Sequence, residues 1–245
     1  MKVLTDCHLC RKSRKRDLYL SRHKMLKSKI NISENYDLLQ GRLEKIKTIL
    51  PEGDSSDVFY EYSEFELDRI RAFHLLIHAE IESYFEERVR QFLSEFEEKW
   101  KSVSTPPALL TMLFSYHPAI EDNSSHGELT KARQLINNNC TKLALDGIVT
   151  FIHGKHDDVV SGNHGIKNSN LDKLLKPTGY DMNHNSTLWP SLNAYGDLRG
   201  KFAHKTHSMV SNIISGPKES LSEVSEIIED IKIFDVKFTE LIHAI

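Results

Sequence analysis

Apolar side chains recur every three or four residues along most of this chain, the spacing that places them on one face of an α-helix. The pattern is clearest between Ser63 and Lys101, which we predict to be one long amphipathic helix with at most one break. Its apolar positions are Ile70, Phe73, Ile77, Ile81, Phe85, Val89, Phe92 and Phe96. The chain shows no internal repeat and no convincing strand pattern, so an all-α fold is expected.

Shorter helices are predicted on both sides of the long one. A helix that starts at Ser33 ends before Pro51, and Pro106 with the next proline interrupts the chain again, because proline donates no amide hydrogen to a helix. A further helix is expected to begin near Glu128 and to end at Ile152, where the sequence turns polar. The other predicted helices cover residues 109–116, 168–175, 189–209 and 218–242, and polar loops are expected at 123–127 and 157–165. The pattern therefore predicts a helical bundle with loop insertions.

Composition favours a globular protein. With 39% apolar and 27% charged residues, a chain of 245 residues can bury a real hydrophobic core. No run approaches the roughly 20 apolar residues that span a bilayer, and the first residues lack the apolar core of a signal peptide. We therefore expect a cytoplasmic protein without membrane association. Residues 31–245 are expected to form a single helical domain, preceded by a basic N-terminal arm or helix at residues 1–30.

The N-terminal segment is strongly basic, although the net charge of −3 gives the whole chain no nucleic-acid footprint. Between Arg11 and Lys29 the only acidic residue is Asp17. Candidate RNA-binding residues in this arm are Arg11, Lys12, Arg14, Lys15 and Arg16. Such a segment attracts a phosphate backbone or an acidic partner, and the alternative is a solvated surface without any partner.

The cysteines offer little chemistry. Cys7 and Cys10 have the spacing of a zinc-binding pair and His23 follows as in a zinc finger, but the fourth ligand is missing. With Cys140 there are three cysteines, which cannot form a closed set of disulfides, so free thiols in a reducing compartment are expected. The chain has no HExxH, no phosphate-binding glycine loop and no GxSxG motif. We expect neither a metal nor a cofactor.

Two histidines of the long helix occupy different positions on it. His74 lies inside the apolar stripe and is expected to be a core histidine whose ring is hydrogen-bonded. His78 and Glu82 lie one helical turn apart at the edge of the stripe, while Glu80 projects from the other flank. That edge either faces a cleft or forms a polar network between packed helices.

The stretch Tyr195–His204 contains residue types that can act on a phosphodiester. Arg199 and His204 are five apart, so on a helix they are separated by about 7.5 Å along the axis and about 140° around it. His204 then shares the polar side with Asn193 and Asp197, and it can meet Arg199 only over a groove beside another surface. A histidine with a pKa of about 6.5 can accept the proton of an RNA 2′-hydroxyl, and a guanidinium can hold the phosphate. The RxxxxH spacing alone occurs often by chance.

A resemblance adds weight to this stretch. Residues 199–204, Arg-Gly-Lys-Phe-Ala-His, resemble the RxxxxH motif of HEPN ribonucleases, including the small residue before the histidine. Residues 76–85 resemble the long acidic helix of the subgroup called RiboL-PSP-HEPN, and residues 163–175 resemble the stretch before its motif helix. Order and spacing agree from residue 60 to residue 240. One position departs from the pattern, since many members have Asn, Asp or His directly after the arginine, where this chain has Gly200.

The resemblance implies a HEPN-type helical bundle that forms a homodimer, with both copies of Arg199 and His204 in one composite cleft. It implies RNA cleavage without a metal, which leaves a 2′,3′-cyclic phosphate and a 5′-hydroxyl. Supporting residues would be His78, Glu80, Glu82 and Asn193, and Lys201 would bind RNA. It also implies a toxin or antiviral effector, for which an antitoxin or a defence-system protein is a candidate partner.

Two other classes of function stay open on the sequence alone. A non-catalytic HEPN module would bind a nucleotide or a partner protein through the same bundle, and Gly200 favours this interpretation. A structural helical adaptor would use the basic arm and the apolar stripes for protein contacts only. The sequence specifies neither the RNA target nor the trigger of activity.

Overall fold

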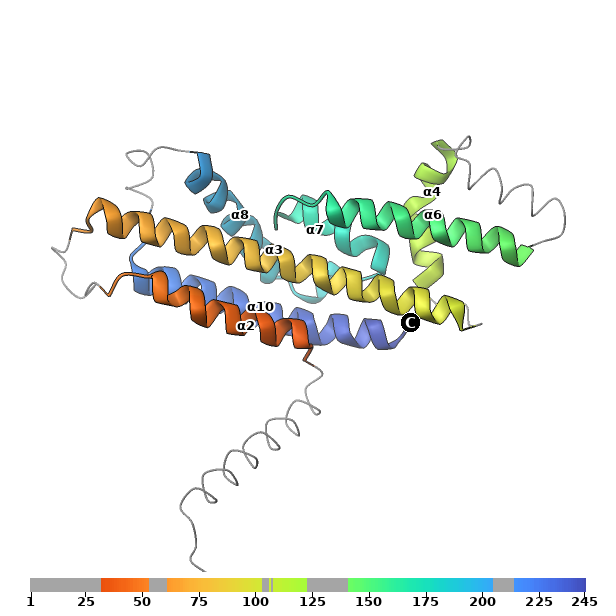
Figure 1. Cartoon of the computed structure of the whole chain (residues 1–245), viewed down its shortest axis with the longest axis horizontal. Helices are drawn as coiled ribbons and strands as arrows, with labels where there is room; N and C mark the ends of the chain where they lie inside the picture. The colour runs from red at the N-terminus through yellow and green to blue at the C-terminus, as the bar shows by residue number, and fades with distance from the viewer. Residues whose placement is uncertain (1–31, 53–60, 103–105, 107, 123–140, 205–213) are drawn as a thin grey trace, which may run out of the picture.

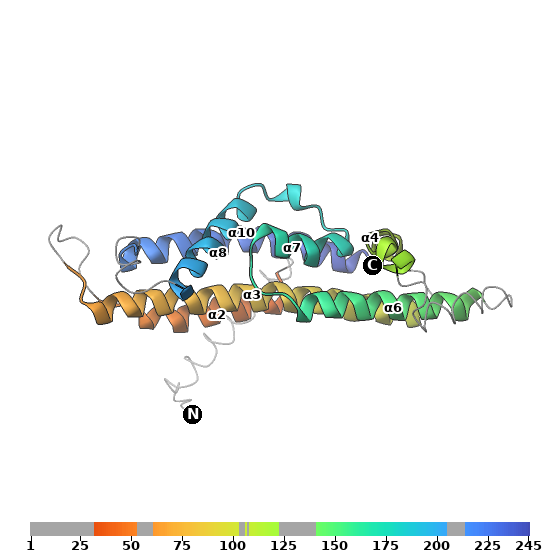
Figure 2. The same ribbon diagram turned by 90° about the horizontal axis from the view of Figure 1, so that it is seen from above.

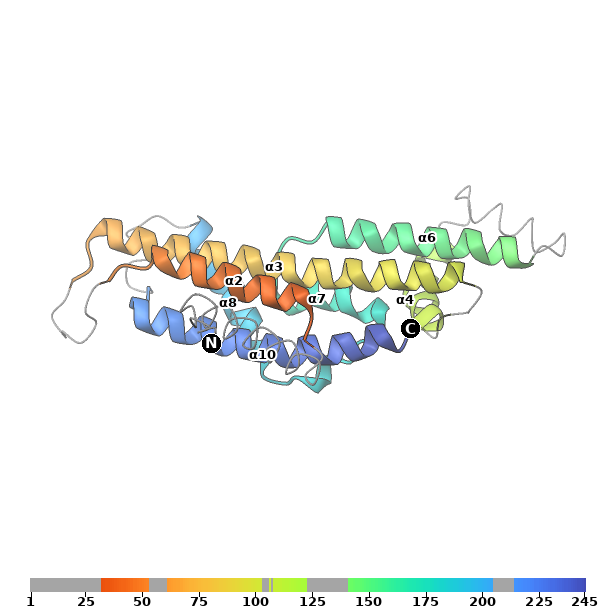
Figure 3. The same ribbon diagram turned by 60° about the horizontal axis from the view of Figure 1, so that its bottom comes forward.

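The long helix predicted from the apolar stripe forms the axis of the molecule. The computed structural model describes residues 32–52, 61–102, 106, 108–122, 141–204 and 214–245. Helix α3 (Glu64–Lys101) runs through the middle of an elongated bundle (Figure 1). Helices α2 (Glu34–Ile46) and α10 (Pro217–His243) lie along one side of it, as Figure 3 also shows.

The remaining helices pack along other parts of α3 and around one of its ends. They are α4 (Ala108–Asp122), α6 (Thr141–Ser161), α7 (Asn168–Leu175) and α8 (Leu188–His204). Short 3₁₀ turns cover Lys47–Ile49, Lys176–Thr178 and Met182–His184. All regular structure in the described residues is helical, which confirms the predicted all-α bundle.

Helix α3 begins and stays continuous for local reasons. The Ser63 hydroxyl accepts the amide hydrogen of Glu66, and the Glu66 carboxylate accepts that of Ser63, so two amides without helical partners are satisfied. The predicted apolar stripe is buried along the whole length of the helix, and the helix has no break. Its phenylalanines pack against α10, with the ring centres of Phe85 and Phe234 4.9 Å apart.

A buried ion pair also ties α3 to α10. Arg88 and Asp235 are fully buried, with the Arg88 Nε atom 3.1 Å from the Asp235 Oδ1 atom. The Tyr84 hydroxyl and the backbone amide of Ser33 donate to the same carboxylate, at 2.7 and 2.6 Å. Because these donors come from α3 and from the start of α2, the carboxylate fixes three helices to one another.

The predicted end of α6 at Ile152 is wrong. The helix continues through the polar residues 153–158 to Ser161 because its buried spacing continues with His156 and Val160, while the polar residues between them lie on the outer face. The His156 Nδ1 atom lies 2.9 Å from the Tyr116 hydroxyl of α4, which gives this buried histidine a polar partner. The loop predicted at residues 157–165 therefore begins only after Ser161.

Other predictions lie outside the described residues. These are the basic arm with its cysteine pair, the loop at 123–127, the helix start at Glu128, and the extension of α8 from residue 205 to Met209. Across the part of the chain that is described, no helix has the length and apolar character needed to cross a bilayer.

Candidate functional site

Helix α8, which carries Arg199 and His204, is held against α3 and α10 by its apolar face. Its buried side chains include Leu188, Trp189, Leu192, Tyr195 and Phe202. Seen from above, α8 and α10 lie on the same side of α3 (Figure 2). The polar side of α8 is consequently turned away from the core.

His74 joins the three helices at this point. Its Nδ1 atom lies 3.1 Å from the hydroxyl of Tyr195 on α8, and its Nε2 atom lies 3.0 Å from the hydroxyl of Ser220 on α10. Burial lowers the pKa of His74 to about 4, so the ring is neutral at pH 7. The prediction of a hydrogen-bonded core histidine is confirmed.

The last described turn of α8 is fixed by a side chain of α3. Arg71 donates from its Nη2 atom to the backbone carbonyl of Phe202 at 2.6 Å, which ties this turn of α8 to α3. The Phe202 ring is buried, while His204 two residues later is exposed. The motif histidine thus projects from a turn of α8 that is anchored to α3.

Arg199 lies beside the polar edge of α3. Burial, and after it the Arg199 guanidinium, lower the pKa of His78 to about 4, so His78 is neutral at pH 7. The His78 Nδ1 atom lies 3.6 Å from the Glu82 Oε2 atom. Burial raises the pKa of the Glu82 carboxyl, and the positive charge of Arg199 opposes part of that rise. The structure therefore brings Arg199 of α8 near His78 and Glu82 of α3. We call His78 and Glu82 the α3 polar pair.

The other predicted supporting residues lie elsewhere. Glu80 faces α2, where its carboxylate accepts from the Nη2 atom of Arg42 at 2.8 Å. Asn193 is half-buried and Lys201 is exposed, both on α8. Of the two acidic candidates, Glu82 is therefore the one that lies near the motif arginine.

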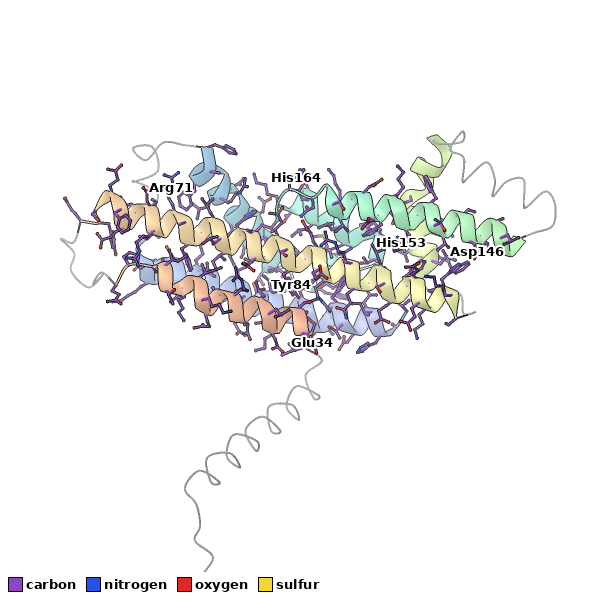
Figure 4. The ribbon with its side chains drawn as sticks, in the orientation of Figure 1. Glu34, Arg71, Tyr84, Asp146, His153 and His164 are labelled. Carbon is purple, nitrogen blue, oxygen red and sulfur yellow. The ribbon has the colours of Figure 1, made fainter. Side chains whose placement is uncertain are left out.

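The loop between α6 and α7 contributes residues that were not among the predicted site residues. Asn163 donates from Nδ2 to the Glu86 Oε1 atom at 2.9 Å, and the backbone amide of Gly165 donates to the Glu82 carboxylate. His164 lies exposed between these two anchors, above the middle of α3 (Figure 4). Burial and Glu86 raise the pKa of Glu82, while Arg199, His164 and the Gly165 amide oppose the rise. The sequence signal for this loop was its resemblance to the stretch before the motif helix.

The arrangement places a cation and an exposed imidazole on one helix. Arg199 is half-buried, and its charge influences the pKa of both His78 and Glu82 on α3. His204 has no ring contact or hydrogen bond within the described residues, and its exposed side chain is accessible to a substrate. A phosphodiester could therefore be held by Arg199 and exchange a proton with His204.

Neither a cluster of metal-binding side chains nor the cavity between α3 and α6 includes Arg199 or His204 in the described residues. No set of three or more His, Cys, Asp or Glu side chains in the described residues is arranged to hold a metal ion. A cavity of about 390 Å³ lies between α3 and α6, lined by Trp100, Asp146 and His153 among others. It is located near the far end of α3, and neither Arg199 nor His204 lines it (Figure 4).

Comparison with known protein families gives one match. The model of the family described as RiboL-PSP-HEPN matches residues 37–242, which include α3, the loop at 163–165 and the motif helix α8. Comparisons with curated proteins and with solved structures gave no match.

Proposed function

Because this chain belongs to the RiboL-PSP-HEPN family, we propose that it is a metal-independent endoribonuclease that uses Arg199 and His204. HEPN domains generally act as ribonucleases. The observation that best supports the proposal is the position of Arg199, whose charge is close enough to influence the pKa of both His78 and Glu82, while the exposed His204 lies on the same helix. RNA cleavage without a metal requires a cation that stabilises the phosphate and a group that transfers protons, and Arg199 and His204 are residues of these two types.

In the proposed reaction, the ribose 2′-oxygen attacks the adjacent phosphorus while the bond from phosphorus to the 5′-oxygen breaks. The products are a 2′,3′-cyclic phosphate and a 5′-hydroxyl. One histidine accepts the proton of the 2′-hydroxyl, and a second proton must reach the departing 5′-oxygen. Arg199 stabilises the negative charge that grows on the phosphate oxygens.

We propose that a homodimer supplies both proton transfers. Two copies of α8 would approach through their polar sides, so that one His204 accepts a proton and the other donates one. The exposed positions of Asp197, Lys201 and His204 support this arrangement, since they leave that side of α8 accessible. Lys201 would then add a positive charge for the RNA backbone.

His78, Glu82 and Asn193 act as supporting residues in this proposal. A neutral His78 adds no second positive charge beside Arg199, and an ionised Glu82 would supply a negative charge near the guanidinium. Glu80 has no such role here, because it pairs with Arg42.

We further propose that the protein is a cytoplasmic toxin or antiviral effector that damages RNA. An antitoxin or another defence protein would then control it. The basic arm at residues 11–29 supports an RNA substrate by its charge, since it offers many cations against one acid.

A non-catalytic module that binds a nucleotide or a partner protein is the second candidate. Gly200 favours it, because many family members have a polar side chain directly after the motif arginine. The position itself is open, since an ideal Cβ atom at residue 200 meets nothing within 4 Å. The packing around residue 200 would therefore accommodate a side chain, and it does not require glycine there.

The two candidates separate in one experiment. The purified chain is incubated with a mixed RNA pool in excess EDTA, and the ends of the products are identified. We expect cleavage that persists in the chelator and yields 2′,3′-cyclic phosphate ends. Cleavage that requires a divalent ion would contradict the mechanism, and RNA binding without any cleavage would favour the non-catalytic module.

A further inference from the structure

The loop that follows α6 touches both helices of the candidate site. On α3, Asn163 contacts Glu86 and the Gly165 amide contacts Glu82. Gly165 has a φ of 144°, which L side chains rarely adopt, and its Cα bears no Cβ atom that would lie against the His78 ring. The loop therefore packs against His78 and Glu82 of α3 before it continues toward α8.

Lys167 makes the contact with α8. Its aliphatic stem lies over Gly196, and a Cβ atom at residue 196 would approach the Lys167 Cγ atom to 2.8 Å and its Cε atom to 3.6 Å. At its tip, the Lys167 ammonium pairs with the Asp197 carboxylate. Gly196 is buried, and its position four residues after Leu192 and seven after Trp189 places it on the buried face of α8, where the lysine stem lies over it.

The contact lies less than one helical turn before Arg199. Gly196 and Asp197 precede the arginine by three and two residues, so their backbone position determines where its side chain begins. The stem matters more than the charge, since both partners of the ion pair are about half exposed, at 44% and 51%, and exposed pairs stabilise by only about 0–1 kcal/mol.

We propose that Lys167 is a positioning residue, whose stem crosses α8 at Gly196 and holds Arg199 beside His78 and Glu82. The inference rests on the proposed ribonuclease function for its kinetic consequence, but the position of Arg199 can be measured separately. A displacement of about 1 Å at a catalytic group can lower a rate by about 100-fold, so a small shift of α8 is sufficient.

Five variants separate the stem, its charge and the space above Gly196. Lys167→Ala removes the stem, and Lys167→Met keeps most of it without the charge. Gly196→Ala inserts a methyl group where Lys167 lies, and the double variant Lys167→Ala/Gly196→Ala removes that clash. Gly200→Ala is the matched control for folding, because it adds the same methyl group on the same helix in open space.

The kinetic expectation is specific to the stem. Lys167→Ala and Gly196→Ala should lower kcat by about 10- to 100-fold with a smaller change in KM, and Lys167→Met should stay within about threefold of the parent. Gly196→Ala should also melt below Gly200→Ala. The double variant should regain that loss of melting temperature and remain slow. Parental kcat in a folded Lys167→Ala variant would overturn the proposal.

An NMR titration of the His78 ring tests the same placement without RNA. Arg199 lowers the pKa of His78, so the pKa should rise in Arg199→Ala and, in the same direction, in Lys167→Ala and Gly196→Ala, but not in Lys167→Met. An unchanged His78 pKa in both Lys167→Ala and Gly196→Ala would overturn the inference. If the parent chain does not cleave RNA, only the proposed function fails, and this titration still decides the role of Lys167.

Discussion

Mild acid should destabilise this protein through its buried histidines. Burial lowers the pKa of His74, His78 and His156 from the ordinary 6.5 to about 4 in each case. Between these two values the unfolded chain binds protons that the folded chain does not bind. The free energy of unfolding must therefore fall as the pH decreases from about 6.5 toward 4.

The size of the effect follows from the same values. For a histidine whose pKa is 6.5 unfolded and about 4 folded, acidification from pH 7 to pH 5 removes about 2 kcal/mol, so His74 and His156 together account for about 4 kcal/mol. His78, whose pKa is also lowered to about 4, acts in the same direction. Since domains are stable by about 5–15 kcal/mol, this is a large fraction.

Comparing single variants separates the effect of one histidine on stability from that of carboxyl groups, which change the stability in the opposite direction as the pH falls. Burial raises the pKa of Glu82 and Glu223, and these carboxyls stabilise the folded state as the pH falls, which offsets part of the loss. His74→Gln keeps a polar side chain between Tyr195 and Ser220 but removes the titration. Ser220→Ala is the matched control, since it removes one hydrogen bond of His74 and keeps the imidazole.

Urea unfolding at constant protein concentration, at pH 7 and at pH 5, measures the difference. His74→Gln should lose about 2 kcal/mol less than the parent on acidification. Ser220→Ala should be less stable by about 1 kcal/mol at both pH values and show the parental loss. An equal loss in His74→Gln and the parent would refute the assignment of His74 as a neutral buried group.

The remaining predictions concern the proposed cleft and the arm. Arg199→Ala should lower turnover by about 10²–10³-fold, and Arg199→Lys should restore little because an ammonium lacks the planar fork, as single-turnover kinetics would show. Mixing an Arg199→Ala chain with a His204→Ala chain should restore part of the activity if the cleft is composite, whereas a mixture as inactive as its components would argue against shared clefts. Deleting residues 1–30 should weaken RNA binding and flatten its salt dependence while circular dichroism stays helical, and an unchanged salt slope would leave the arm without a role in binding.

The sequence was most informative where one periodic pattern decides the structure. The stripe of α3 predicted both the helix and its buried face, and it placed His74 in the core, where its ring is hydrogen-bonded. The apolar pattern did not predict the end of α6 correctly, because polar residues 153–158 suggested an end although His156 and Val160 continue the buried face. A polar run on an outer helix face does not stop a helix.

The site was only partly predictable because its partners come from distant segments. Glu80 and Glu82 project from different flanks of α3, and only the packing of α2 and α8 decides that Glu80 meets Arg42 while Glu82 lies near Arg199. The contacts of Asn163 and Gly165 depend on how a loop crosses α3. The path of that loop leaves no periodic pattern in the sequence. Similarly, the Arg88–Asp235 pair joins segments that only the fold brings together.

His204 gives the most direct test of the central claim, that this chain cleaves RNA through its RxxxxH motif. Single-turnover cleavage of an RNA pool in EDTA is compared for the parent, His204→Ala, and His184→Ala, an exposed histidine outside the candidate site, with melting curves measured beside the rates. We expect that His204→Ala melts like the parent and cleaves about 10²–10⁴-fold more slowly, while His184→Ala keeps the parental rate. Parental cleavage by a His204→Ala variant with an unchanged melting curve would contradict the claim.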